Sequence, residues 1–115
     1  MPAGVKIASM RASPAPLLWN VCTQPRGIAT KSPAEAAAYL RDCHVALVGI
    51  DSHNIDNTTG NDRPVHTTLL EADILIVEHL CNLHLLPHEG FAFSAVPPKF
   101  KGVGTFPVRA MAKVR

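Results

Sequence analysis

The sequence predicts an α/β fold, because helix patterns and buried-strand patterns alternate along its second half. The first helix is expected from Ser32 to Cys43 or His44, and an apolar run without polar alternation follows at residues 45–50. A second helix signal begins at Pro64, and a second apolar run follows at residues 74–77. Since short, continuous apolar runs are typical of strands buried on both faces, we expect one small domain with helices packed on a sheet.

The first helix has a strong start signal. Ser32 is suited to the N-cap, Pro33 to the first helical position, and Glu35 stands three residues after the serine, as in a capping box. Ala36, Ala37 and Leu40 fall on one face, which we expect to pack in the core. The sequence therefore predicts a helix whose beginning is defined by its own side chains.

The remaining segments divide into polar connections and short strands. Residues 51–63 form a polar loop rich in Asp, Asn, Thr and Gly, while further strands are expected at 91–96 and 108–114. Residues 1–31 are expected to be irregular, because prolines and glycine interrupt them, with one short strand possible at 5–8.

Composition excludes several classes of protein. With 115 residues, a net charge of +2, 5% aromatic residues and scattered Lys and Arg, the sequence predicts no binding to nucleic acid. No apolar run approaches the ~20 residues that cross a bilayer, and no signal peptide is recognisable. Three widely spaced cysteines indicate reduced thiols, so we expect a cytoplasmic protein. The 47% hydrophobic content leads us to expect that some apolar surface packs against something outside the chain.

Acidic residues follow both buried strands. Asp51 comes after the first strand and Glu78 after the second, and the carboxyl ends of strands are where α/β proteins bind ligands. His66 lies at the start of the intervening helix, so the three side chains could converge at one end of the sheet. Imidazole and carboxylates suit zinc or manganese. The alternative is an ordinary polar strand end and a solvated histidine, and two ligands alone would hold a catalytic metal poorly.

A second candidate metal site lies in the segment HLCNLHLLPH at residues 79–88. Pro87 would break a helix that placed His84 and His88 one turn apart, and no second cysteine completes a zinc-finger pattern. Leucines recur at near-helical spacing between the histidines. We therefore expect this segment to be a turn that packs on the core.

Several uncommon motifs occur in one order from Ser32 onward: VGID at 48–51, PVH at 64–66, VEHL at 77–80, NLHLLP at 82–87, GF at 90–91 and PVRA at 107–110. This order resembles the C-terminal half of the cyclase family of metal-dependent hydrolases, which includes bacterial kynurenine formamidase. The resemblance implies the C-terminal part of a swivelling β/β/α fold at residues 32–115, with a mixed sheet and two short helices.

The resemblance also implies a metal site. His66 and Glu78 fall on the His and Glu that the family's C-terminal half contributes as ligands. Asp51 matches the Asp of VGID, which would shape the loop, and His79 stands beside the ligand Glu, where it could support the ligands from behind. The family's other ligands and its catalytic His belong to a His-x-Gly-Thr-His motif that is absent from these 115 residues. We therefore expect no catalytic residue in this chain, which would be a truncated C-terminal half.

By resemblance, the function would be metal-dependent hydrolysis of an amide, as in an arylformamidase acting on N-formylkynurenine in tryptophan catabolism. Zinc or manganese would be the cofactor, bound weakly or not at all by the isolated chain, and a homo-oligomer or a complementing N-terminal half would be the partner. The alternative is a non-catalytic fragment or a partner-dependent interaction domain. Glu71 and Asp73, where members usually have Gly, could tilt the second helix or its turn.

Overall fold

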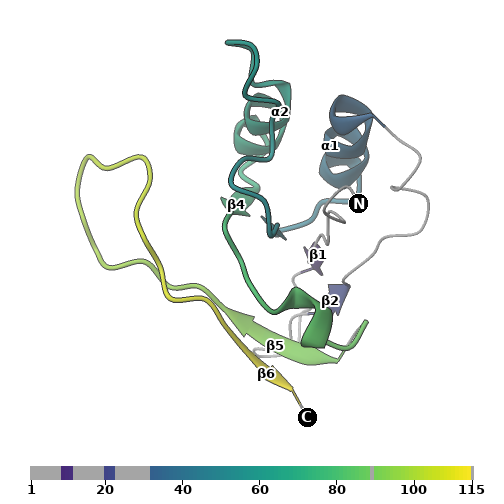
Figure 1. Ribbon diagram of the computed structural model, residues 1–115, viewed down its shortest axis with the longest axis vertical. Coiled ribbons are helices and arrows are strands. Elements are labelled where there is room, and N and C mark those ends of the chain that lie inside the picture. Colours follow the sequence, from purple (N-terminus) through teal and green to yellow (C-terminus); the bar gives the residue numbers. More distant parts are fainter. Residues whose placement is uncertain (1–8, 12–19, 23–31, 89, 115) are drawn as a thin grey trace.

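The protein has two helices packed side by side on a parallel pair of strands, with two antiparallel strand pairs nearby (Figure 1). The computed structural model describes residues 9–11, 20–22, 32–88 and 90–114. Its elements, in chain order, are β1 (Ser9–Arg11), β2 (Asn20–Cys22), α1 (Pro33–Asp42), β3 (Leu47–Gly49), α2 (Pro64–Glu71), β4 (Leu75–Val77), the short 3-10 helix η1 (Leu83–Leu85), β5 (Phe91–Ser94) and β6 (Met111–Val114). This mixed α/β content confirms the predicted fold class.

Helix α1 begins as its sequence predicts. The backbone N–H of Ser32 donates to Glu35 Oε2 at 2.8 Å, and the N–H of Glu35 donates to Ser32 Oγ at 3.4 Å, which completes the capping box. Ala37 and Leu40 are buried, and Cys43 is the C-cap. Helix α2 begins at Pro64, also as predicted, but its N-terminus is stabilised differently, as described below.

The parallel pair of β3 and β4 brings the carboxyl ends of the two predicted buried strands together. Leu47 pairs with Leu75 and Gly49 with Val77, and backbone hydrogen bonds continue beyond the strands, from the Ile50 N–H to the Val77 carbonyl at 2.9 Å. The main core lies between this sheet and the helices. Its buried members are Ala37, Leu40, Val45, Val48, Ile50, Val65, Leu69 and Ile74.

The expectation that residues 74–77 are buried on both faces is only partly correct. Ile74 is buried and Ile76 packs on the helix-covered core, but Leu75 is 62% exposed. Successive side chains alternate between the faces of a strand, and β4 is an edge strand of its pair. The described residues therefore cover one face of β4 more completely than the other.

The N-terminal segment is not irregular throughout, and this corrects the expectation for residues 1–31. Strands β1 and β2 form an antiparallel pair, in which β1 also contacts β3 and β2 contacts β5. The sequence did not reveal them because strands of three residues are too short for a hydrophobic alternation to be recognised. The strand that was considered possible at 5–8 lies outside the described residues.

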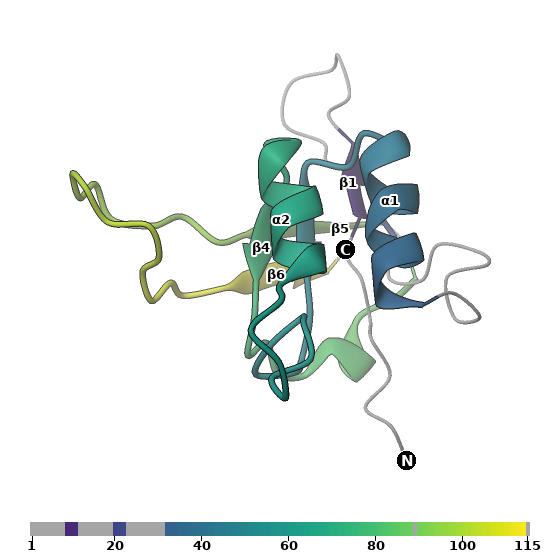
Figure 2. The same cartoon turned by 90° about the horizontal axis from the view of Figure 1, so that it is seen from above.

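Strands β5 and β6 form an antiparallel pair below the parallel sheet, and their connection extends far from the rest of the molecule (Figures 1 and 2). Phe91 and Phe93 are buried and contact residues that include Ala46 and Leu47. We call residues 95–110 the arm. Its exposed apolar side chains are Val96, Phe100, Val103 and Phe106, and its two phenylalanine rings stack with centroids 4.5 Å apart.

No helix in the described part of the chain is long and apolar enough to cross a membrane, since α1 has 10 residues and α2 has 8.

Both helices end with the same backbone motif, in which the residue after the C-cap has a positive φ. This residue is His44 (φ 52°) after α1 and Asp73 (φ 57°) after α2. After α2, the Asp73 N–H donates to the Leu70 carbonyl at 3.0 Å and the Ile74 N–H to the Leu69 carbonyl at 2.9 Å. This Schellman pattern usually has Gly at the positive-φ position. Asp73 therefore adopts the backbone conformation that a glycine would take here.

Replacing Asp73 with glycine should stabilise the protein by about 0.5–1 kcal/mol, because glycine adopts a positive φ without steric cost. The measurement is the urea midpoint of Asp73→Gly, compared with that of Asp73→Ala. Both variants remove the same charge from the helix end, so their difference isolates the backbone effect. An alanine variant as stable as the glycine variant would contradict this explanation.

Candidate functional site

Three polar side chains meet at the carboxyl end of the parallel strands: Asp56, His66 and Glu78. Glu78 directly follows β4, His66 lies in the first turn of α2, and Asp56 lies in the loop that joins β3 to α2. The β3–β4 pairing and the adjoining start of α2 place all three at one end of the sheet. We call these residues the acid–histidine cluster.

Asp56 is the buried member of the cluster, and it caps α2. Its side chain is 2% exposed, and its carboxylate accepts the backbone N–H of Val65 on Oδ1 and that of His66 on Oδ2, each at 2.9 Å. Among the described residues, the N-cap Arg63 makes no capping hydrogen bond with its own side chain, and Pro64 has no N–H to offer. Asp56 therefore supplies the cap that the sequence next to the helix lacks.

His66 lies between the two carboxylates. Its Nδ1 is 2.7 Å from Asp56 Oδ2, and its Nε2 is 3.4 Å from Glu78 Oε1. The side chains of His66 and Glu78 are 21% and 22% exposed, so this end of the cluster is accessible to solvent. Glu78 Oε1 also accepts the backbone N–H of Ile55 at 2.8 Å, which fixes the carboxylate.

Asp56 is held in its charged form. Burial by itself would raise the pKa of this carboxyl, but hydrogen bonds from the backbone N–H groups of His66 and Val65 and from the His66 ring outweigh burial. The Coulombic interaction with His66 acts in the same direction, and the pKa of Asp56 lies below its ordinary value of 3.8. An ionised carboxylate can only accept hydrogen bonds. Three N–H groups donate to the Asp56 carboxylate: the backbone N–H groups of Val65 and His66 and the Nδ1–H of the His66 ring.

The sequence singled out four residues here, and the structure brings two of them together. His66 and Glu78 are neighbours, whereas Asp51 is exposed and the carboxylate that contacts His66 is Asp56. His79 is exposed and has a φ of 58°, and its N–H donates to the Ser52 carbonyl at 3.0 Å. Its ring centroid is 6.4 Å from that of His53.

Asp56 is the functional candidate that sequence reasoning missed. One signal could have indicated it: Ile55 and Asp56 place an apolar residue and an acid side by side in an otherwise polar loop. The contact between Asp56 and the start of α2 depends on the path of the loop. A loop has no periodic sequence pattern from which that path could be predicted.

The segment at residues 79–88 packs on the core, as expected. Leu83 is buried in η1, while Leu80 and Leu86 contact the cluster of Phe91 and Phe93. Within the ranges that the structure describes, no group of three or more His, Cys, Asp or Glu side chains is arranged to hold a metal. Because Asp56 is engaged by α2, the acid–histidine cluster leaves two partly exposed side chains, His66 and Glu78, as candidate metal ligands.

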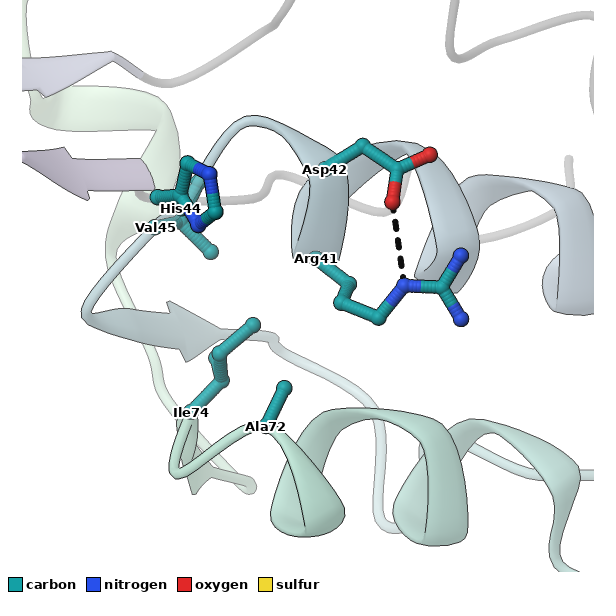
Figure 3. A pocket seen from close by; sticks show the side chains of 6 residues that line it. All are labelled: Arg41, Asp42, His44, Val45, Ala72 and Ile74. Atoms are coloured by element: carbon teal, nitrogen blue, oxygen red, sulfur yellow. Dashed lines mark hydrogen bonds and ion pairs between the residues drawn. The ribbon is translucent and has the colours of Figure 1, made fainter.

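A hollow of about 400 Å³ lies at the opposite end of the sheet (Figure 3). It is lined by Arg41, Asp42, His44, Val45, Ala72 and Ile74, which precede the parallel strands or end the helices. Arg41 Nε pairs with the neighbouring Asp42 at 3.0 Å, so the charges that line the hollow neutralise one another. This hollow is therefore separate from the acid–histidine cluster.

Comparisons with known proteins give two likenesses. The chain is 35% identical over 74 residues to a kynurenine formamidase of Salinibacter ruber (strain DSM 13855 / M31), a match that covers 64% of this chain and 34% of the relative. Its structure resembles a solved structure described as a potential metal-dependent hydrolase with cyclase activity, with a TM-score of 0.63 and 33% identity over 71% of this chain and 40% of that one. No family model matches.

The chain thus spans about a third of the length of the curated relative. The sequence likeness and the structural likeness point in the same direction, and they agree with the order of motifs from Ser32 onward. Together they support a cyclase-family C-terminal region in this chain.

Proposed function

We propose that this chain supplies two ligands, His66 and Glu78, to the metal site of an amide hydrolase of the cyclase family. The observation that carries the proposal is the 3.4 Å separation of His66 Nε2 and Glu78 Oε1. Two ligand atoms at ~2.0–2.2 Å from a tetrahedral zinc ion are about 3.3–3.6 Å apart. The donor atoms therefore already have the spacing that one shared metal ion requires.

The chemistry of the donors supports the same assignment. An imidazole nitrogen and a carboxylate oxygen suit zinc or manganese. A divalent metal at this position would polarise the carbonyl group of an amide substrate. His66 and Glu78 would hold and orient that ion, and their partial exposure leaves a side open for substrate.

The substrate that the relatives favour is a small aryl amide. The name of the Salinibacter ruber relative supports an N-formylkynurenine-like compound, and the description of the solved structure supports metal-dependent hydrolysis. A catalytic zinc site commonly has three protein ligands. At least one further ligand would therefore come from outside the acid–histidine cluster, either from a complementing chain or from a second copy in a homo-oligomer.

A second candidate function is a partner-dependent interaction domain without catalysis of its own. The arm favours it, because its exposed side chains Val96, Phe100, Val103 and Phe106 gather apolar surface on one segment, where the rings of Phe100 and Phe106 stack. The two candidates differ in metal binding, which only the hydrolase requires.

Metal binding by the purified chain tests the proposal. Zinc titrated into the wild-type chain should bind weakly, and His66→Ala or Glu78→Ala should abolish measurable binding, because either change leaves one donor. Isothermal titration calorimetry gives the affinity. His84→Ala is the matched control, since it removes an exposed histidine away from the cluster and should retain wild-type affinity.

Hydrolysis of N-formylkynurenine is the second readout. The isolated chain should show little or no turnover with zinc or manganese, because the acid–histidine cluster supplies two ligands and a catalytic zinc site commonly has three. Turnover should appear on addition of a polypeptide that carries a His-x-Gly-Thr-His motif, and His66→Ala should eliminate it. Zinc affinity in His66→Ala equal to that of the wild type would refute the ligand assignment.

A further inference from the structure

We propose that Asp56 is a positioning residue that fixes the His66 ring as the Nδ1–H tautomer and directs Nε2 toward Glu78. The conclusion that His66 and Glu78 are oriented to bind a metal rests on the function proposed above. The tautomer of His66 does not depend on that function, and it can be measured in the metal-free protein.

The first step of the argument is which nitrogen carries the proton. Asp56 Oδ2 lies 2.7 Å from His66 Nδ1, a short distance typical of a charge-assisted hydrogen bond. Because an ionised carboxylate can only accept, the Nδ1 atom must donate. In the neutral ring the lone pair then lies on Nε2, which is the atom that faces Glu78.

The second step is the orientation of the ring. Asp56 Oδ2 accepts both the backbone N–H of His66 at 2.9 Å and its ring Nδ1–H. One oxygen atom thus holds two donors of the same residue, which restricts rotation of the ring relative to α2. Asp56 Oδ1 holds the N–H of Val65 and anchors the carboxylate to the same helix turn.

The third step concerns the second donor. The loop that carries Asp56 also fixes Glu78, since the neighbouring Ile55 donates its N–H to Glu78 Oε1 at 2.8 Å. The loop itself is braced, because the Asp56 N–H donates to Asn54 Oδ1 at 2.9 Å. Residues 54–56 therefore align both metal-ligand atoms. The backbone N–H of Ile55 holds Glu78 Oε1, and the side chain of Asp56 holds the His66 ring.

This arrangement has a chemical consequence. Nε2 and Oε1 are both electron-pair donors in this tautomer, and they face each other at 3.4 Å with no shared proton. Two such atoms repel until a cation lies between them. Metal-binding histidines commonly donate their other ring N–H to a carboxylate, and loss of that carboxylate costs about 10–100-fold in metal affinity.

Nitrogen-15 NMR of the imidazole rings tests the assignment in metal-free protein. Spectra are recorded at alkaline pH, because the two nitrogens of a neutral imidazole ring are distinguishable. The His66 signals are identified by their loss in His66→Gln. We expect a protonated Nδ1 and an unprotonated Nε2 in the wild type, with the Nδ1–H proton far downfield and slow to exchange. A predominant Nε2–H tautomer in the wild type would overturn the proposal, whatever any variant does.

The variant Asp56→Ala should return His66 to a mixture of tautomers and weaken zinc binding about 10–100-fold. Asp62→Ala, which removes an exposed acid from the same loop, should change neither property. A folded Asp56→Ala protein whose His66 remains purely Nδ1–H would also overturn the proposal. Failure of the wild type to bind zinc, with the tautomer as expected, would instead count against the metal function alone.

Discussion

Replacing Leu69 with alanine should destabilise the protein by about 3–5 kcal/mol, the cost of a large cavity in a tightly packed core. Leu69 is 0% exposed, and it packs where α2 meets α1 and the parallel sheet. A domain of this size has a total stability of about 5–15 kcal/mol, so the loss takes a large share of it. The variant should unfold at a much lower urea concentration.

The matched control for this prediction is the next residue of the same helix. Leu70 is 52% exposed, and Leu70→Ala should change stability by about 0.5 kcal/mol or less. Equilibrium urea unfolding followed by circular dichroism gives both values under identical conditions. Equal losses in the two variants would mean that α2 does not pack with Leu69 inward.

Replacing Asp56 with alanine should cost about 2–4 kcal/mol at neutral pH. The change removes the acceptor of two backbone N–H groups in the first turn of α2, those of Val65 and His66. Pro64 offers no N–H, and the N-cap residue Arg63 does not provide a replacement among the described contacts. The helix terminus would therefore lose its cap and a favourable negative charge together.

The cost of Asp56→Ala should depend on pH in one direction. The pKa of Asp56 is lowered in the folded protein from the ordinary value of 3.8, so its stabilising contribution is complete above 3.8. The contribution is lost as the pH falls through the folded pKa, because the protonated carboxyl caps the helix poorly. Urea unfolding at several pH values should thus give a constant difference above the ordinary pKa and a shrinking one below it. A difference that grew on acidification would contradict the charged cap.

The helices were predictable because their signals are local. Ser32, Pro33 and Glu35 form a capping box within four residues, and Pro64 marks the start of α2. The pairing of β3 with β4 was implied by the helix between them, since parallel strands need such a crossover. The strands at residues 9–11 and 20–22 were missed because their stability comes from pairing with each other and from contacts with β3 and β5.

Part of the candidate site was also predictable from signals that are local in the sequence. His66 and Glu78 are connected by one helix–strand step, so their separation in sequence fixes the end of the sheet at which both lie. Asp56 reaches His66 across an irregular loop, and only the folded path of that loop brings it there. Asp51 was the more obvious acid because it follows a strand, but it remains exposed.

The length of the arm has an energetic meaning. The entropy of closing a loop grows only with the logarithm of its length, so halving the connection between β5 and β6 would change the closure term by about 0.6 kcal/mol. That change would favour the shorter chain, and tight turns join antiparallel strands with far fewer residues. The pairing of β5 with β6 therefore does not require the full length of the arm, although Ala95 and Ala110 at its two ends pack against Phe91 and Phe93. Deletions within the arm should leave the rest of the fold intact, which makes it the part of the chain with the greatest freedom to vary in length.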